Sequence, residues 1–117
     1  MIYTAGSVSL AMLEVLAHGV EESEAHDYEV TPVDFDQALV ATASVDDLPR
    51  DWSAPAPSLA TQMFGIEWVR SNKTPALRVP SAVNPLEFNY LLNPNHRRWR
   101  ELRIGNPITW PFDPRLV

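Results

Sequence analysis

The sequence predicts an α+β domain, with mixed or antiparallel sheets and a few short helices. Segments rich in β-branched and aromatic residues, which favour strands, outnumber the helical patterns. They do not alternate regularly with those patterns, as the strands of a doubly wound parallel sheet would. Eleven prolines divide the chain into short elements. The 117 residues suit one domain, so we expect a single domain over residues 1–117.

The first expected elements are a short strand at residues 1–5 and a helix of about ten residues after it. Ser7 or Ser9 can cap this helix, because a serine hydroxyl accepts from a free backbone N–H. Gly19 can end it, since glycine tolerates a left-handed backbone.

Glu14 is the one acidic residue of this helix, on a face shared with Leu10, Leu13 and Ala17. The helix is apolar nearly all round, which is typical of a buried helix. An unpaired buried carboxylate costs several kcal/mol. Glu14 therefore either points to water at an exposed edge or lines a cleft.

The next segments are loops and strands. Residues 20–28 form an acidic loop, and residues 28–35 form a strand that Pro32 confines to an edge or kinks. Residues 37–44 fit either a strand or a buried helix, and we favour the strand. Residues 46–57 contain three prolines and form a loop.

Ser58 caps a second helix that runs to residue 71, in which Leu59, Met63 and Ile66 follow helical spacing. The remaining elements are short. They are strands at residues 75–81, 87–93, 101–104 and 108–112, and a turn or short helix at residues 93–99.

The composition excludes several functions. Nine basic and fifteen acidic residues give a net charge of −6, which argues against nucleic acids and anionic membranes as partners. The basic segment at residues 96–103 fits a solvated surface, or a contact for an acidic partner or phosphate. There is no cysteine, which excludes disulfides and thiolate chemistry. No segment resembles a membrane span or signal peptide, so we expect a cytoplasmic protein.

Common site motifs are absent. His18, His26 and His96 are too dispersed for a metal site, and no glycine-rich phosphate loop is present. Ser81 is not in a nucleophile elbow, and by itself it fits a surface or capping serine. Tyr3 by itself fits a strand aromatic that packs in the core.

Two sequence blocks resemble the RES domain family. "IYTAGSVSLAMLEVLAH" is similar to its central motif, in which a tyrosine precedes an alanine- and leucine-rich helix with a glutamate and often a histidine; Tyr3, Glu14 and His18 match. The segment at residues 65–96 is similar to the second block, and "FDPRL" to its end. The matching residues of these two segments are Gly65, Trp68, Ser71, Pro80, Ser81, Asn89, Asn93, Pro94, His96, Asp113, Arg115 and Leu116.

This resemblance implies a fold like that of ADP-ribosyltransferases and a toxin of a bacterial toxin–antitoxin pair. NAD+ is then a substrate rather than a cofactor, cleaved at the nicotinamide–ribose bond by hydrolysis, phosphorolysis or ADP-ribosyl transfer. Glu14 and Tyr3 would be catalytic, and Tyr3 and Ser81 would bind NAD+. The implied partner is an Xre-type antitoxin, and no metal is implied.

One residue of the family pattern has no counterpart. The family's arginine precedes the tyrosine, whereas Tyr3 follows only two residues here; Arg50, Arg70 and Arg78 belong to other segments. We therefore expect an N-terminally short RES-like domain. Its start could be truncated, another chain could supply the arginine, or the domain could be degenerate. A non-catalytic module that binds an Xre-type antitoxin and a protein ADP-ribosyltransferase stay open as alternatives, and an incomplete sheet favours homo-oligomers.

Overall fold

A four-stranded mixed sheet forms the centre of the structure. The computed structural model describes residues 1–19 and 27–116. The strand order is β1-β6-β5-β4; β6 is antiparallel to both β1 and β5, and β4 is parallel to β5. The strands are β1 (Ile2–Ala5), β4 (Val40–Thr42), β5 (Ala76–Pro80) and β6 (Phe88–Leu92). This mixed sheet confirms the predicted α+β class.

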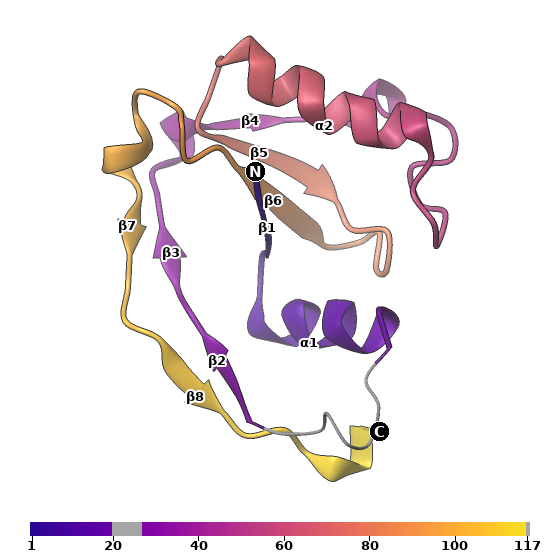
Figure 1. The fold of residues 1–117 in the computed structure, drawn as a ribbon, viewed down its shortest axis with the longest axis vertical. Helices are drawn as coiled ribbons and strands as arrows, with labels where there is room; N and C mark the ends of the chain where they lie inside the picture. Colours follow the sequence, from indigo (N-terminus) through magenta and orange to yellow (C-terminus); the bar gives the residue numbers. More distant parts are fainter. Residues whose placement is uncertain (20–26, 117) are drawn as a thin grey trace.

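Two antiparallel ribbons form a curved band that stands apart from helix α2 (Figure 1). One pairs β2 (Tyr28–Val30) with β8 (Ile108–Trp110), and the other pairs β3 (Val33–Asp34) with β7 (Arg103–Ile104). The predicted strand at residues 28–35 is thus interrupted around Pro32, as its missing N–H requires.

Helix α2 (Leu59–Ser71) covers one face of the sheet (Figure 1). Ser58 caps it by accepting from the N–H of Thr61, and Asn72 ends it in the left-handed conformation, with φ of 50°. Trp68 packs from this helix against the sheet in one core cluster, whose buried members are Ala43, Trp68, Leu77, Val79 and Leu91.

The opposite face of the sheet carries the second core cluster. Its buried members are Leu39, Ala76, Leu92 and Leu102, with aromatic and aliphatic side chains from β3 and its surroundings packed against them. Because side chains alternate along a strand, neighbouring residues of β5 and β6 supply the two clusters.

The expectation of a buried first helix is wrong. Helix α1 (Val8–Ala17) buries only Leu10 fully, while Val8 is 49% and Leu13 is 42% exposed. The reason is its position beside one end of the sheet, where only one side of it is covered (Figure 1). The caps were predicted well, because Ser7 accepts from the N–H of Leu10 and Gly19 has a φ of +87°.

Other expected elements are shorter than predicted. Within residues 37–44, only Val40–Thr42 is a strand, after a 3-10 helix at Gln37–Leu39. Of residues 101–104, the first lies in a 3-10 helix (Trp99–Glu101) and only β7 is a strand. The expected acidic loop lies largely outside the described residues. Two further 3-10 helices among the described residues are Val45–Asp47 and Pro114–Leu116.

Candidate active site

Helix α1 directs Glu14 toward the end of the central sheet. The N–H of Gly6, just before the helix, donates to the backbone oxygen of Phe88 on β6 at 3.0 Å. A Cβ at Gly6 would lie 2.9 Å from that oxygen, so this close approach requires glycine. Leu10 is fully buried, and Glu14 lies four residues further on the same helical face.

Tyr3 and Asn89 project from the same face of the sheet. Tyr3 pairs with Leu91 across β1 and β6, and Ala5 pairs with Asn89. Alternation along the strands therefore places both side chains on the face that α2 covers. Asn89 is fully buried, whereas the ring of Tyr3 is half exposed with its hydroxyl turned to Asn89.

Ser81 lies immediately after β5, in the loop that leads to β6. The loop is closed by two backbone hydrogen bonds of 2.9 Å, from the N–H of Ser81 to Glu87 and from the N–H of Glu87 to Asn84. The Ser81 hydroxyl accepts from the N–H groups of Val83 and Asn84, both at 3.2 Å. These contacts fix a fully buried hydroxyl with one proton left to donate.

The four side chains meet at the Glu14 carboxylate. Its Oε1 accepts from Ser81 Oγ at 3.0 Å and from Asn89 Nδ2 at 2.9 Å. Asn89 Nδ2 also donates to the Tyr3 hydroxyl. Glu14 is half-buried, so these donors compensate for part of its lost hydration. The carboxylate is therefore held by two hydrogen bonds within the protein, which excludes the alternative that Glu14 simply points to water.

Tyr3 is kept in its neutral form by its surroundings. Burial of its hydroxyl and the negative charge of Glu14 raise the pKa of Tyr3 from 10.0 to about 12, against a smaller opposite effect of the Asn89 hydrogen bond. A neutral phenol donates a hydrogen bond rather than accepting a proton. The site therefore combines a carboxylate acceptor with a phenol donor.

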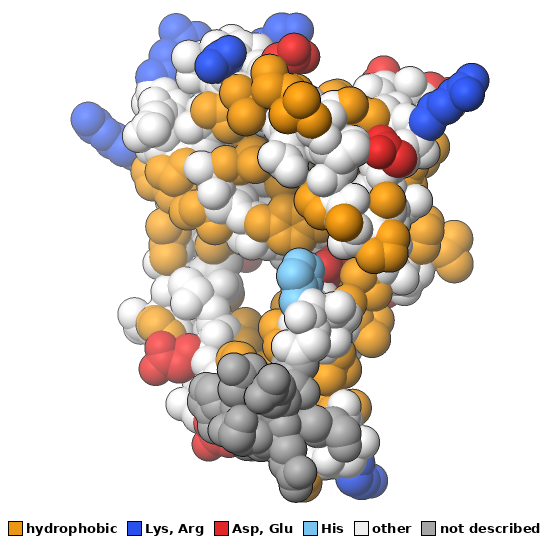
Figure 2. All heavy atoms as spheres, turned by 45° about the vertical axis from the view of Figure 1, so that its right-hand side comes forward, with side chains coloured by type: hydrophobic (Ala, Val, Ile, Leu, Met, Phe, Trp, Pro, Cys, Tyr) orange, Lys and Arg blue, Asp and Glu red, His pale blue; other side chains and the backbone are white. Residues whose placement is uncertain are grey.

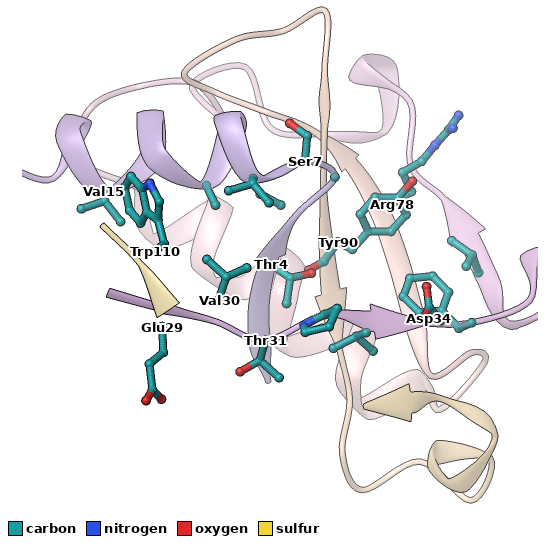
Figure 3. A pocket seen from close by; sticks show the side chains of 18 of the residues that line it. Thr4, Ser7, Val15, Glu29, Val30, Thr31, Asp34, Arg78, Tyr90 and Trp110 are labelled. Carbon is teal, nitrogen blue, oxygen red and sulfur yellow. The ribbon is translucent and has the colours of Figure 1, made fainter. Parts of the chain in front are cut away.

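A cavity of about 890 Å³ lies on the other face of the sheet. Thr4, Tyr90 and Arg78 occupy one row across β1, β6 and β5, and all three line it. Figure 3 shows the cavity between this row and the β2–β8 ribbon, where Trp110 lies near Val15 of α1. Alternation places the Tyr3–Asn89 pair on the opposite face, so this cavity and the carboxylate cluster are separate features.

Arg78 does not take the place of the family's arginine at the cluster. Its guanidinium lies 4.1 Å from the centre of the Phe88 ring, on the cavity face of the sheet. Its buried Nε has no hydrogen-bond partner among the described residues.

Two other residues of the family motif, His96 and His18, make hydrogen bonds that stabilise the fold. The ring Nε2 of His96 lies 2.9 Å from the carbonyl oxygen of Asn72, and its Nδ1 accepts from the N–H of Arg98 at 3.0 Å. Because a carbonyl only accepts, the proton must sit on Nε2. His18 caps α1, with Nδ1 2.7 Å from the Glu14 carbonyl oxygen. In residues 1–19 and 27–116, no group of three or more histidine, aspartate or glutamate side chains is placed to hold a metal ion.

Sequence reasoning selected three of the four residues of the cluster. Tyr3, Glu14 and Ser81 come from three separate segments, and the fold brings them together. Asn89 was noted only as a matching position of the second block. An asparagine in the middle of an apolar strand was the available signal, because a buried amide needs polar partners.

Comparisons with known proteins agree on one family. The RES domain family matches residues 1–113. A protein of Yersinia enterocolitica named "Toxin Res" is 39% identical over 98% of this chain and 76% of its own length. A "Toxin Res" of Photorhabdus laumondii is 41% identical over 99% of this chain and 75% of its own length. A "Prs ADP-ribosylating toxin" of a Sphingobium species is 29% identical, over all of this chain and 74% of its own length.

The structure is thus an α+β domain in which a carboxylate, a phenol, a serine hydroxyl and an amide are gathered at one end of the central sheet. The chain belongs to the RES domain family. Within the described ranges, neither helix has the length and hydropathy of a membrane span.

Proposed function

We propose that this protein is a toxin that consumes NAD+ by cleaving its nicotinamide–ribose bond. The observation that carries the proposal is the Glu14 carboxylate, held by Ser81 and Asn89 beside the Tyr3 hydroxyl. Family membership and the names of the relatives support it. NAD+ is a substrate in this proposal, and no resident cofactor takes part.

The reaction breaks the bond between ribose C1′ and the nicotinamide nitrogen, and the electron pair leaves with nicotinamide. Positive charge then develops on the ribose. A fixed carboxylate near that charge stabilises the transition state more than the ground state. The oxygen of water or phosphate bonds to C1′ and releases its proton. Tyr3 offers its half-exposed ring to the nicotinamide or its ribose. Direct binding of NAD+ by Ser81 stays a prediction.

Transfer of the ADP-ribosyl group to a protein is the second candidate reaction. The printed name of the Sphingobium relative, an ADP-ribosylating toxin, favours it. The first steps are the same, and only the acceptor at C1′ differs. A radiolabelled or biotinylated NAD+ distinguishes them, because transfer leaves the label on protein and hydrolysis does not.

An Xre-type antitoxin that covers the site is the proposed partner, in the cytoplasm. Apolar side chains neighbour the cluster in sequence and are exposed; they are Met1, Ile2, Leu13, Val83 and Leu86. Figure 2 shows hydrophobic side chains over much of one face, around a deep hollow. Exposed apolar surface of this kind marks protein contacts. Among the described residues β1 lies at an edge of the sheet, and such an edge can pair with a second copy in a homo-oligomer.

The test is NAD+ consumption by the purified chain beside Glu14→Gln, with and without phosphate. Glutamine keeps the size of the side chain and an oxygen that accepts from Ser81 and Asn89, so folding is retained. We expect the rate to fall by about 100-fold or more, since the negative charge is lost. Growth arrest on expression should disappear with it.

Glu67→Gln is the matched control, because Glu67 is exposed on α2, outside the cluster. It should consume NAD+ like the parent. Equal rates for the parent and Glu14→Gln would refute the role of Glu14. A folded parent that leaves NAD+ intact would refute the enzyme and favour the non-catalytic binding module. A rate that rises with phosphate would identify phosphate as the acceptor.

A further inference from the structure

The side-chain amide of Asn89 bridges the two groups proposed to act on the substrate. It is fully buried on β6, and its Nδ2 donates both to the Tyr3 hydroxyl and to Glu14 Oε1, the latter at 2.9 Å. A side-chain amide nitrogen carries two hydrogens. Both are therefore used within the cluster, one toward the strand β1 and one toward the helix α1.

The charge of Glu14 fixes the orientation of this amide. A flipped Asn89 would place its oxygen against the carboxylate oxygen, which is repulsive because neither atom carries a proton. The observed orientation leaves Oδ1 of Asn89 buried, with no hydrogen-bond partner among the described residues. Burying an acceptor without a partner is unfavourable. The two bonds made by Nδ2 must therefore offset that cost.

This arrangement determines which atoms are left for a ligand. The Tyr3 oxygen accepts from Asn89, so its own proton is available, and no acceptor receives it within residues 1–19 and 27–116. Glu14 Oε1 already accepts two bonds, from Ser81 and Asn89. Glu14 Oε2 makes no hydrogen bond to the described residues. The open atoms are thus one donor, the Tyr3 O–H, and one acceptor, Glu14 Oε2.

We propose that Asn89 is a positioning residue that sets the hydrogen-bond polarity of the site. It leaves the Tyr3 O–H to donate to the substrate. It also leaves Glu14 Oε2 to accept from the substrate and to present the negative charge to it. The inference rests on the proposed function only for the identity of the substrate. A ligand group that combines an acceptor and a donor fits this pair, as the carboxamide of nicotinamide or the diol of ribose does.

Ser81 acts in the same way. Its hydroxyl accepts from two backbone N–H groups and gives its single proton to Glu14. It is fully buried, and its proton is directed to Glu14, so it supports the orientation of the carboxylate. Asn89 differs from Ser81 because it alone among the described residues joins Glu14 to Tyr3.

The experiment combines NMR without NAD+ and kinetics with it. In the parent, the two side-chain N–H signals of 15N-labelled Asn89 should be separated and shifted downfield by their two acceptors. Tyr3→Phe should move one signal, and Glu14→Gln should move the other. If neither N–H signal moved in either variant, Asn89 would not bridge Tyr3 and Glu14, and this conclusion would hold whether or not the protein consumes NAD+.

The kinetic variants are Asn89→Ala, which removes both donors, and Asn89→Asp, which keeps the shape and replaces the donors by oxygen. We expect kcat to fall on the order of 100-fold in both, as for a small displacement of a reacting group, with KM changed less than about 3-fold. A kcat within about 3-fold of the parent in both variants would overturn the positioning role.

Asn93→Ala is the matched control for burial. Asn93 is a second buried asparagine beyond the end of β6, and its side chain contacts Asn72 and the backbone of Asn95 instead of the cluster. It should lower stability but keep kcat of the folded protein. If it lowered kcat as much as Asn89→Ala, the effect would be structural. If the parent consumes no NAD+, the proposed function fails, and the NMR arm alone decides the role of Asn89.

Discussion

Replacing Ser81 by alanine tests the cluster with the least change of volume. The hydroxyl is fully buried and makes three hydrogen bonds, one to Glu14 at 3.0 Å and two from the N–H groups of Val83 and Asn84 at 3.2 Å. Ser81→Ala removes all three at once. The carboxylate keeps one donor, Asn89.

The expected loss of stability follows from the kind of bond. A hydrogen bond to a charged group contributes about 1.5 kcal/mol or somewhat more. The two bonds from the backbone contribute about 0.5 kcal/mol together, because Val83 is 39% exposed and water can replace the lost acceptor. We expect the free energy of unfolding to fall by about 2 kcal/mol. For a chain of this length that lowers Tm by roughly 8 °C.

Thermal unfolding followed by circular dichroism measures this loss, with Ser71→Ala as the matched control. Ser71 makes one hydrogen bond, to the carbonyl oxygen of Trp68 at 2.6 Å, outside the cluster. Its replacement should cost about 1 kcal/mol or less. NAD+ consumption of Ser81→Ala should fall about 10-fold, since Glu14 loses one of its two donors, whereas Ser71→Ala should retain full activity.

A Tm of Ser81→Ala within about 2 °C of the parent, with unchanged NAD+ consumption, would refute the reasoning. The hydrogen bond from Ser81 to Glu14 would then be absent in solution, or without effect on the carboxylate. A large fall in Tm with an unchanged rate per folded molecule would support a role of the Ser81 hydroxyl in stability and refute its role in catalysis.

Two further predictions concern pH and the second block. Because the pKa of Tyr3 is about 12 in the folded chain and 10.0 ordinarily, the unfolded chain loses this proton first. Stability should therefore fall as pH rises from 10 toward 12, and this part of the fall should vanish in Tyr3→Phe; urea unfolding at pH 8 and pH 11 measures it, and identical pH dependence of the two proteins would contradict it. His96→Ala should lower the free energy of unfolding by about 2 kcal/mol, since the buried ring loses two hydrogen bonds, one to the Asn72 carbonyl and one from the Arg98 N–H. A Tm within about 2 °C of the parent would show that the ring carries no such structural role.

Local signals predicted most of the secondary structure. Ser7 and Ser58 begin the two helices, and Gly19 follows the first, because caps depend on neighbouring backbone groups. The strands β5 and β6 lie within the predicted segments. Elements with weak local signals were predicted less accurately. The segment at residues 37–44, for example, was predicted as one strand but divides into a 3-10 helix and a strand.

Burial of α1 was the main error, because it depends on what surrounds the helix. The apolar composition predicted a buried helix, yet the helix lies at the end of the sheet with Val8 and Leu13 exposed. A periodic pattern states which residues share a face, but not how many faces are covered. Glu14 lies on the covered face with Leu10, so its surroundings could not be derived from composition.

The sequence by itself determined the family, the two helices with their caps, and three residues of the candidate site, because short motifs and local hydrogen bonds are contained in neighbouring residues. The tertiary structure decided what those residues do together. Hydrogen bonds between residues 67 to 86 positions apart join them into one cluster, which follows from the pairing of β1 with β6 and the placing of α1. It also revealed Asn89 as the connecting residue, since hydrogen-bond donors are assigned by three-dimensional geometry and not by order along the chain.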